Sequence, residues 1–402
     1  MRLGTSVTGV AMTSAGATAR LPEFTLAVTP LDRGVLVPAL ALLAIGFIAI
    51  SSASVEYAAE HYGSAMHHSY RHLIYVGLAL TAATVVLLIP TQFWAATGWI
   101  WLFFGLSLLV LVLIPGIGIK VNGSRRWLDL GPLTLQVSEF SKLFLVVYLA
   151  GYLQRREDQV RSEWQGFIKP MAVVFAITLL LMVEPDFGAT VVTVGAAFGM
   201  LFLAGVRLGH FLLVMLGSVL ALGVLLVSAP YRLKRLTAFT DPWADQFDTG
   251  YQLTQSLIAF GRGEWFGVGL GNSVQKLFYL PEAHTDFVFS IWAEEMGFVG
   301  AVSVMALFLA LIFRIFRIAR AQEIAGNCFG AQLCYGIGLV IAAQAFINIG
   351  VSAGLLPTKG LTLPLVSYGG STLIATCCML AIVLRVERES RAAPERGSRR
   401  GR

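Results

Sequence analysis

The 402-residue chain is 56% hydrophobic and only 13% charged, with a mean hydropathy of +0.75. This composition excludes a soluble globular protein of this length, because too little polar surface would be left to face water. The net charge of +6 does not indicate nucleic-acid binding, since Lys and Arg lie between apolar runs and at the C-terminus instead of forming one basic face.

The chain begins with a segment, residues 1–33, that is rich in Thr, Ala and Gly and has no unbroken apolar core. A cleaved signal peptide requires such a core, so this segment is expected to be a flexible cytoplasmic tail. Apolar runs then recur from Val35 to Leu384 without a polar block long enough to fold by itself. We therefore expect one membrane domain, residues 34–389, followed by a basic cytoplasmic tail, residues 390–402.

Apolar runs that approach the roughly 20 residues needed to cross about 30 Å of hydrocarbon predict the transmembrane helices. In chain order they are 35–52, 72–89, 93–114, 138–153, 171–183, 187–206, 208–229, 287–313, 329–353 and 363–384. The fourth run is short and charged. The predicted fold class is all-α, a polytopic membrane bundle of about ten transmembrane helices with a large extracytoplasmic loop, residues 230–285, between helices 7 and 8.

Both termini are predicted to be cytoplasmic, because an even number of spans returns the chain to its starting side and Lys and Arg are more frequent there. Two external loops oppose this bias. They carry Lys120, Arg125 and Arg126 in one case and Arg232, Lys234, Arg235, Arg262 and Lys276 in the other. Two explanations remain open: long loops translocate largely regardless of charge, or these cations attract an anionic ligand such as a phosphate.

No nucleotide cofactor is expected, because the chain has no GxxxxGK sequence and its glycine-rich stretch follows no strand of a βαβ unit. The four cysteines lack CxxC spacing, which argues against a zinc site or a disulfide framework. The histidines near the first external loop have no carboxylate at metal spacing and are interpreted as interfacial polar residues.

The first candidate site residues surround the short fourth span. Arg125 and Arg126 precede Glu139 and Lys142, which are three residues apart and share one helix face, so the last two can form an ion pair. Two interpretations remain open. The pair stabilises a membrane helix, or Lys142 and the arginines bind a pyrophosphate while Glu139 orients the lysine or a divalent cation.

The long loop is the only sizeable segment predicted outside the membrane, and such loops usually carry function. It ends where Asp286 meets an apolar helix. A carboxylate there can cap the helix. However, Glu282, His284 and Glu294 crowd the same stretch, and carboxylates at membrane depth are costly and by default functional. A helix cap and a catalytic carboxylate therefore both remain open.

A last irregular segment, Gly354 to Thr372, interrupts two apolar runs with prolines, glycines and Lys359. Irregular backbone at membrane depth is tolerated only where protein or a wet cavity covers it. The segment is either a cavity wall or a simple external hairpin.

These segments, together with Leu253 to Leu277, resemble the SEDS (shape, elongation, division, sporulation) family of peptidoglycan glycosyltransferases, and the resemblance runs from about Leu31 to Glu389. The stretch GRGEWFGVGLGNSVQK followed by LPEAHTDF is similar to the cell-division branch, whereas the elongation relative RodA usually differs in its glycine-rich part. The resemblance implies polymerisation of lipid II into glycan strands at the septum, on the outer face of the bacterial inner membrane.

The resemblance also implies site residues and partners. It identifies Asp286 as catalytic and Glu139, Lys142, Lys359, Ser367, Tyr368, Gly369 and Gly370 as cavity positions. Arg125, Arg126, Arg262, Glu282 and His284 complete the candidate substrate-binding residues. The implied partners are a class B penicillin-binding protein, FtsI, and the division proteins FtsQ, FtsL and FtsB. A divalent cation, Mg²⁺ or Mn²⁺, near Glu139 or Asp286 is the one cofactor considered.

Glycosyl transfer from lipid II is chemically consistent with a single catalytic carboxylate. The lipid pyrophosphate is a far better leaving group than the sugar alcohol that a glycosidase must protonate. Asp286 would remove the proton of the acceptor's 4-hydroxyl while cations hold the departing pyrophosphate. Two alternatives use the same features: a lipid II flippase, which also needs buried carboxylates and broken helices, and a divisome scaffold that recruits a transpeptidase.

Overall fold

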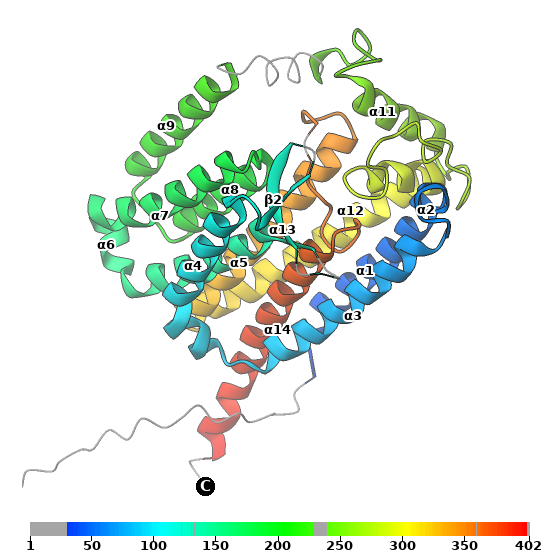
Figure 1. Ribbon diagram of the computed structural model, residues 1–402. Coiled ribbons are helices and arrows are strands. Elements are labelled where there is room, and N and C mark those ends of the chain that lie inside the picture. Colours follow the sequence, from blue (N-terminus) through cyan, green and yellow to red (C-terminus); the bar gives the residue numbers. More distant parts are fainter. Residues whose placement is uncertain are drawn as a thin grey trace, which may run out of the picture.

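The computed structural model describes residues 30–121, 123–129, 131, 134–227, 239–358 and 360–399. Most of these residues belong to helices packed into one bundle (Figure 1). The long helices are α1 (Arg33–Ala53), α3 (His67–Leu88), α4 (Thr91–Leu113), α5 (Val137–Arg155), α7 (Trp164–Val183), α8 (Phe187–Leu203), α9 (Leu208–Val227), α12 (Val288–Ile324), α13 (Cys328–Ser352) and α14 (Gly370–Arg399). The shorter ones are α2 (Val55–Tyr62), α6 (Glu157–Ser162) and α11 (Tyr251–Gly263).

Within the described residues, seven helices are long and apolar enough to cross a membrane: α1, α3, α4, α7, α12, α13 and α14. The shorter apolar helices α8 and α9, together with α5, bring the bundle to the predicted number of spans. The outer surface is apolar, with Phe103, Phe175 and Leu309 largely exposed. Such a surface suits lipid as its solvent, so the predicted polytopic membrane bundle is confirmed.

The centre of the bundle is formed by α5, α13 and α14, which bury most of their residues, whereas α3 and α4 bury few of theirs. A small antiparallel sheet, which the sequence analysis did not predict, covers one end of this centre. Its strands, β1 (Gly118–Val121), β2 (Ser124–Asp129) and β3 (Thr134–Gln136), pair in the order β1-β2-β3. Ser371 at the start of α14 ties the sheet to the bundle, because its hydroxyl accepts from Gln136 N at 2.8 Å.

The start of α14 differs from the prediction. The helix begins at Gly370, whereas the apolar run predicted a start at Leu363. Residues 363–369 instead form a turn in which Ser367 Oγ accepts from Leu363 N at 2.8 Å and Leu365 adopts a positive φ of 65°. The turn is apolar because its leucines are buried, and Pro364 removes a backbone donor within it. α14 also continues to Arg399, so the predicted C-terminal tail begins as helix.

The two ends of the bundle have different character. At one end, Asp32 before α1 accepts from Arg314 Nε of α12 and from Arg391 of α14, each at 2.9 Å. The hydrogen bond from Arg314 lowers the pKa of Asp32. At the other end lie the sheet, α2, α11 and the loops before α12 and α14 (Figure 1). The described N- and C-terminal ends of the chain therefore lie on the same side of the bundle.

The helix α12 is broken at Gly297, where φ is 66° and ψ is −165°. The break leaves backbone N–H and C=O groups of α12 without partners inside the helix. Residues of the segment after α11 form hydrogen bonds with these groups. Val268 N and Gly269 N each donate over 3.0 Å to the carbonyls of Glu294 and Glu295, while Phe298 N and Val299 N donate to the carbonyls of Glu264 (2.9 Å) and Trp265 (3.2 Å). Loop and helix thus complete each other's hydrogen bonding, as burial requires.

Gly297→Ala is expected to lower the thermal unfolding midpoint. An added Cβ would lie 2.4 Å from Gly267 N, and the positive φ is unfavourable for alanine, so a cost of about 1–3 kcal/mol is expected. The matched control is Gly195→Ala in α8, where nothing lies within 4 Å of the new Cβ and alanine favours the helix. Equal midpoints for both variants in the same detergent would show that the α12 break is not fixed by this glycine.

Candidate active site

Asp286 lies in the turn that leads into α12. The turn is closed by Glu282, whose carbonyl accepts from Thr285 N and Phe287 N at 3.2 Å. Asn348 of α13 fixes it from behind, with Nδ2 donating to the carbonyls of Asp286 (2.8 Å) and Leu361 (2.5 Å). Asp286 does not cap α12, because the N-cap residue is Phe287 and no side chain caps the helix. The helix-cap interpretation is therefore wrong.

The carboxylate of Asp286 forms no hydrogen bond or salt bridge within the described part of the chain. A Cβ on Gly360 would lie 2.9 Å from its Oδ2, so the glycine leaves this side of the carboxylate open. Asp286 is partly buried, and this burial raises the pKa of Asp286 to about 7; the charge of Glu282 raises it further and Arg126 lowers it. A carboxylate that titrates near neutral pH is suited to general-base catalysis.

Arg126 and Asp186 form the neighbouring wall of the site. Arg126 projects from β2, with its guanidinium 3.8 Å from Asp186 Oδ1, and a quarter of its side chain remains exposed. Asp186 is fixed at the start of α8, because it accepts from Ala189 N (3.1 Å) and from Ser138 Oγ (3.0 Å). Arg125 lies opposite Lys120 in the β1–β2 register. Because side chains alternate along a strand, Arg125 and Lys120 point to the opposite face of the hairpin from Arg126, so Arg126 is the cation that the hairpin places near Asp286.

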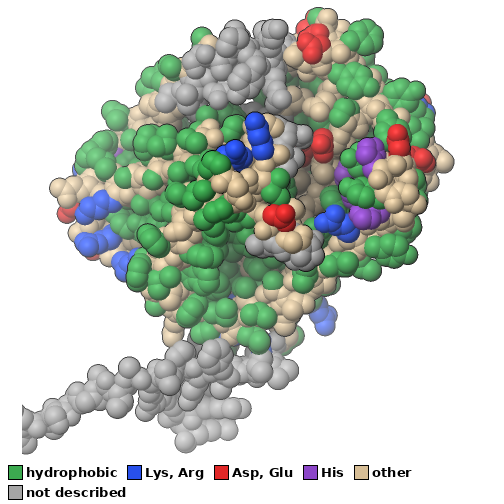
Figure 2. Space-filling model, viewed as in Figure 1, with side chains coloured by type: hydrophobic (Ala, Val, Ile, Leu, Met, Phe, Trp, Pro, Cys, Tyr) green, Lys and Arg blue, Asp and Glu red, His purple; other side chains and the backbone are tan. Residues whose placement is uncertain are grey.

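An aromatic and histidine cluster forms the wall on the side of α2 and α3. Tyr368 N donates to the His284 carbonyl at 3.1 Å, which joins the two loops of the site. The His284 ring lies 4.9 Å from that of His68 and 5.2 Å from that of Tyr57. Burial lowers the pKa of His284 to about 4, so this ring is neutral at pH 7. Figure 2 shows histidine side chains gathered on this side of the molecule.

Glu139 and Lys142 are enclosed in the bundle. Lys142 Nζ lies 2.8 Å from Glu139 Oε1, Gln344 Nε2 donates to Glu139 Oε2 at 3.3 Å, and both charged residues are at most 2% exposed. Gln344 lies one turn of α13 before Asn348. The geometry is that of an internal ion pair, and a pyrophosphate could reach Lys142 only if the enclosure opened.

The remaining candidates are dispersed. Arg262 lies in the last turn of α11, 3.4 Å from Glu294 of α12, and not in the turn of Asp286. Ser367 closes the turn before α14, Gly369 lies beside Thr362, and Gly370 packs so tightly on the Tyr75 ring that a Cβ would approach it to 2.4 Å. Lys359 lies outside the described residues. Arg126, Glu282, His284 and Tyr368 are the candidates that the structure gathers around Asp286.

The sequence analysis missed three residues of this region. Asp186 anchors Arg126, Asn348 holds the turn of Asp286, and Glu184 is fully buried with neither carboxylate oxygen bonded to a described residue. Burial raises the pKa of Glu184 to about 8. Glu184 and Asp186 had a detectable signal in the sequence, because they fill the short gap between two apolar runs.

Two further features bear on ligands. The described residues contain no group of three His, Cys, Asp or Glu that could hold a metal ion alone. Mg²⁺ at phosphate sites needs only one or two carboxylates beside the phosphate oxygens, so the cation stays a prediction.

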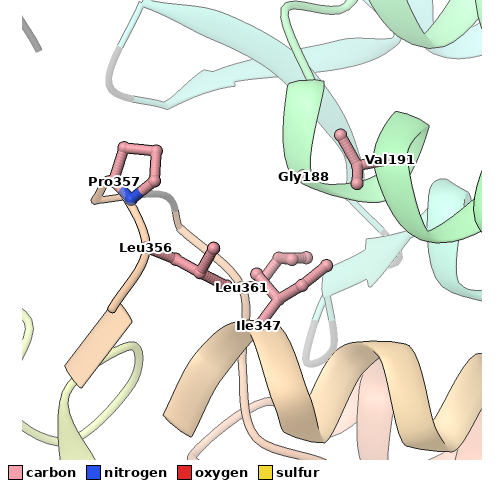
Figure 3. A pocket seen from close by; sticks show the side chains of 6 residues that line it. All are labelled: Gly188, Val191, Ile347, Leu356, Pro357 and Leu361. Carbon is pink, nitrogen blue, oxygen red and sulfur yellow. The ribbon is translucent and has the colours of Figure 1, made fainter. Parts of the chain in front are cut away.

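An apolar pocket of about 90 Å³ lies between α8, α13 and the segment before α14. It is lined by Gly188, Val191, Ile347, Leu356, Pro357 and Leu361 (Figure 3).

Comparison with known proteins gives consistent results. The family model for FtsW, RodA and SpoVE, described as "Cell cycle protein", matches residues 33–392. Proteins named "Probable peptidoglycan glycosyltransferase FtsW" are similar: that of Hahella chejuensis is 55% identical over 90% of this chain and 91% of its own length. That of Pseudomonas fluorescens is 53% identical over 90% and 89%.

Solved structures share the fold. A chain from a study described as "Structural coordination of polymerization and crosslinking by a peptidoglycan synthase complex" has a TM-score of 0.74 at 30% identity, covering 89% of this chain and 98% of its own. The rod shape determining protein RodA of Thermus thermophilus has a TM-score of 0.68 at 29% identity, covering 90% and 98%.

Proposed function

We propose that this chain, which belongs to the family of cell cycle proteins FtsW, RodA and SpoVE and is a peptidoglycan glycosyltransferase, extends glycan strands from lipid II with Asp286 as its catalytic base. The observation that carries this assignment is the carboxylate of Asp286, which bonds to no described residue and lies near Arg126 of β2, and whose pKa is raised to about 7 by burial. A base and an anion-binding wall are the two components that the reaction needs.

In the proposed reaction, the 4-hydroxyl oxygen of the acceptor sugar attacks the anomeric carbon of the donor sugar. The bond from that carbon to the pyrophosphate oxygen breaks, and the pyrophosphate leaves with the electron pair. Asp286 takes the hydroxyl proton, while Arg126 stabilises the departing negative charge. No general acid is required, because the pyrophosphate leaves without being protonated. A divalent cation would add charge stabilisation at the pyrophosphate, and no step of this scheme depends on it.

The apolar pocket supports a lipid-linked substrate. All six of its lining residues are apolar or glycine, and Leu361 connects it to Asp286 through the shared hydrogen bonds of Asn348. A hydrocarbon chain in or near this pocket would therefore leave its pyrophosphate close to the base. We infer that the isoprenoid of lipid II approaches the site between α8 and α13.

We further propose that the site lies on the outer face of the inner membrane, that both termini are cytoplasmic, and that the enzyme works at the septum. The support is that both described chain ends lie together, opposite the site, beside Arg314 and Arg391. One structural relative comes from a complex that couples polymerisation to crosslinking. Crosslinking needs a transpeptidase, so we propose a class B penicillin-binding protein, FtsI, as partner, with FtsQ, FtsL and FtsB completing the assembly.

The function is tested with labelled lipid II and the purified protein bound to its cognate transpeptidase. Polymeric glycan is the expected product. A flippase would instead move labelled lipid II between the leaflets of a proteoliposome without making polymer. A scaffold would make no polymer, and division would survive substitution of Asp286 but not substitution of partner-facing residues. Polymer formation by the wild-type complex excludes both alternatives as the sole function.

The rate of polymerisation is expected to fall as the pH drops below about 7, because protonation of Asp286 removes the base. Glu282→Gln removes a negative charge that raises the pKa of Asp286, so the midpoint of the pH–rate curve should move to lower pH. Arg126→Gln removes a positive charge that lowers this pKa, so the midpoint should move to higher pH.

The control for these pH profiles is Asp248→Asn, which removes an exposed charge in another part of the loop. Its midpoint should equal that of the wild type. Midpoints that move in the same direction for Glu282→Gln and Arg126→Gln would contradict titration of Asp286 as the origin of the profile.

A further inference from the structure

The segment 265–281, here called the aromatic loop, displays no exposed charge. It contains one charged residue, Lys276, and that side chain is buried. Lys276 Nζ is 3.2 Å from Glu295 Oε1 and donates to Ser52 Oγ (3.1 Å) and to the Gly271 carbonyl (2.7 Å). The single charge of the aromatic loop is therefore neutralised inside the protein.

The surface of the aromatic loop is instead apolar. Trp265 is 67% exposed and Phe266 82%, and Leu270, Phe278 and Tyr279 are each about half exposed. Exposed apolar residues in one continuous patch mark contact with another apolar phase or partner. Trp and Tyr are also the residues that prefer the boundary between membrane and water.

This patch is continuous with the lipid-facing side of α12. The Trp265 ring packs edge-on against Phe298 with centroids 5.3 Å apart, and Val299 N donates to the Trp265 carbonyl. Phe298 and Val299 are exposed, and the same helix then exposes Met305 and Leu309 as it crosses the membrane. The rings of the aromatic loop thus extend a surface that already faces lipid.

The backbone and buried charges of the aromatic loop are compatible with a membrane environment. Its amides at Val268 and Gly269 donate to the carbonyls freed by the α12 break, and Glu294 accepts from Val274 N and Gln275 N. Glu294 and Glu295 are paired with Arg262 and Lys276. Irregular backbone enters the bilayer only where protein satisfies its polar groups, and these amides of the aromatic loop meet that condition.

We propose that the aromatic loop is immersed in the bilayer leaflet on the side of the active site, with its rings at the boundary between headgroups and acyl chains. This proposal differs from the expectation that the whole of residues 230–285 lies outside the membrane. Because Asp286 follows the aromatic loop after a short turn, the immersed loop also sets the depth of Asp286 relative to the headgroups. The placement rests on exposure and hydrogen bonding and is independent of the catalytic assignment.

The test compares nitroxide labels on the full-length protein in lipid nanodiscs, in which collisions with oxygen report lipid and collisions with a water-soluble nickel chelate report water. Labels are placed at Phe266→Cys and Leu270→Cys. Leu309→Cys, on the lipid-facing side of α12, is the lipid control. Cys328 is half-buried and is replaced by Ser; the other three cysteines are buried and do not react.

The matched water control is Phe247→Cys. Phe247 is 87% exposed and belongs to the same long loop, but exposed acidic residues, Asp245 and Asp248, flank it. Labels at positions 266 and 270 are expected to favour oxygen over nickel, as the label at 309 does, and the label at 247 should favour nickel. A nickel preference at 266 and 270 would overturn the proposal in favour of water. Low collision rates with both reagents would overturn it in favour of a covering protein surface.

Discussion

Asp286→Asn is expected to lower the rate of glycan polymerisation by about 10² to 10⁴, because an amide cannot accept the proton of the acceptor hydroxyl and general-base catalysis contributes a factor of this size. The fold should be unaffected. The carboxylate of Asp286 bonds to no described residue, and the turn is held through the backbone carbonyl, which the substitution retains.

The measurement is the initial rate of polymer formation from labelled lipid II by complexes matched for protein content and thermal unfolding midpoint. Glu282→Gln is the control, because it removes an exposed carboxylate in the same turn without removing the base. Near wild-type rates for a well-folded Asp286→Asn variant would rule out Asp286 as the base. A comparable loss in both variants would indicate that local negative charge, and not a single base, supports the reaction.

The membrane helices were predictable because lipid imposes a strong condition on sequence: a spanning segment must be apolar over its whole length. Two features of the fold were not predicted correctly, the start of α14 and the three strands. Residues 363–369 are as apolar as a helix since their side chains are buried, so hydropathy could not distinguish a covered turn from the start of α14. The three short strands carry charged residues and contain too few residues for a clear alternating pattern.

The site was predictable only where local spacing determines contact. The i and i+3 spacing of Glu139 and Lys142 predicted their ion pair, and the junction of loop and helix singled out Asp286. The contacts of Asn348 with the turns of Asp286 and Leu361 depend on how three distant segments pack, and no local pattern encodes them. Glu294 was a candidate because it lies deep in the membrane helix. The structure gives it another role, since it holds the aromatic loop.

Contacts among α5, α8 and α13 hold the site in a fixed geometry inside the fluid bilayer. The turn of Asp286 is fixed by α13, Arg126 is fixed through Asp186 at the start of α8, and both helices pack against α5. α5 and α13 are in turn joined by the hydrogen bond between Glu139 and Gln344. The buried ion pair therefore lies at the centre of the framework that positions the base and the cationic wall.

Lys142→Met is expected to destabilise the protein by about 3–5 kcal/mol, because it leaves Glu139 charged and buried without its cation. The double variant Glu139→Gln with Lys142→Met should recover most of this loss, since no unpaired charge remains and Gln344 still has an amide to bond. The thermal unfolding midpoints of the wild type, both single variants and the double variant measure the coupling between the two residues.

Polymerisation by the double variant then separates the two interpretations of this pair. If Glu139 and Lys142 only support the framework, a stable double variant should retain most of the wild-type rate. If Lys142 binds the pyrophosphate during turnover, the double variant should be stable but inactive. A Lys142→Met variant with a wild-type midpoint would contradict the expected cost and show that Glu139 is neutralised by a proton when its cation is removed.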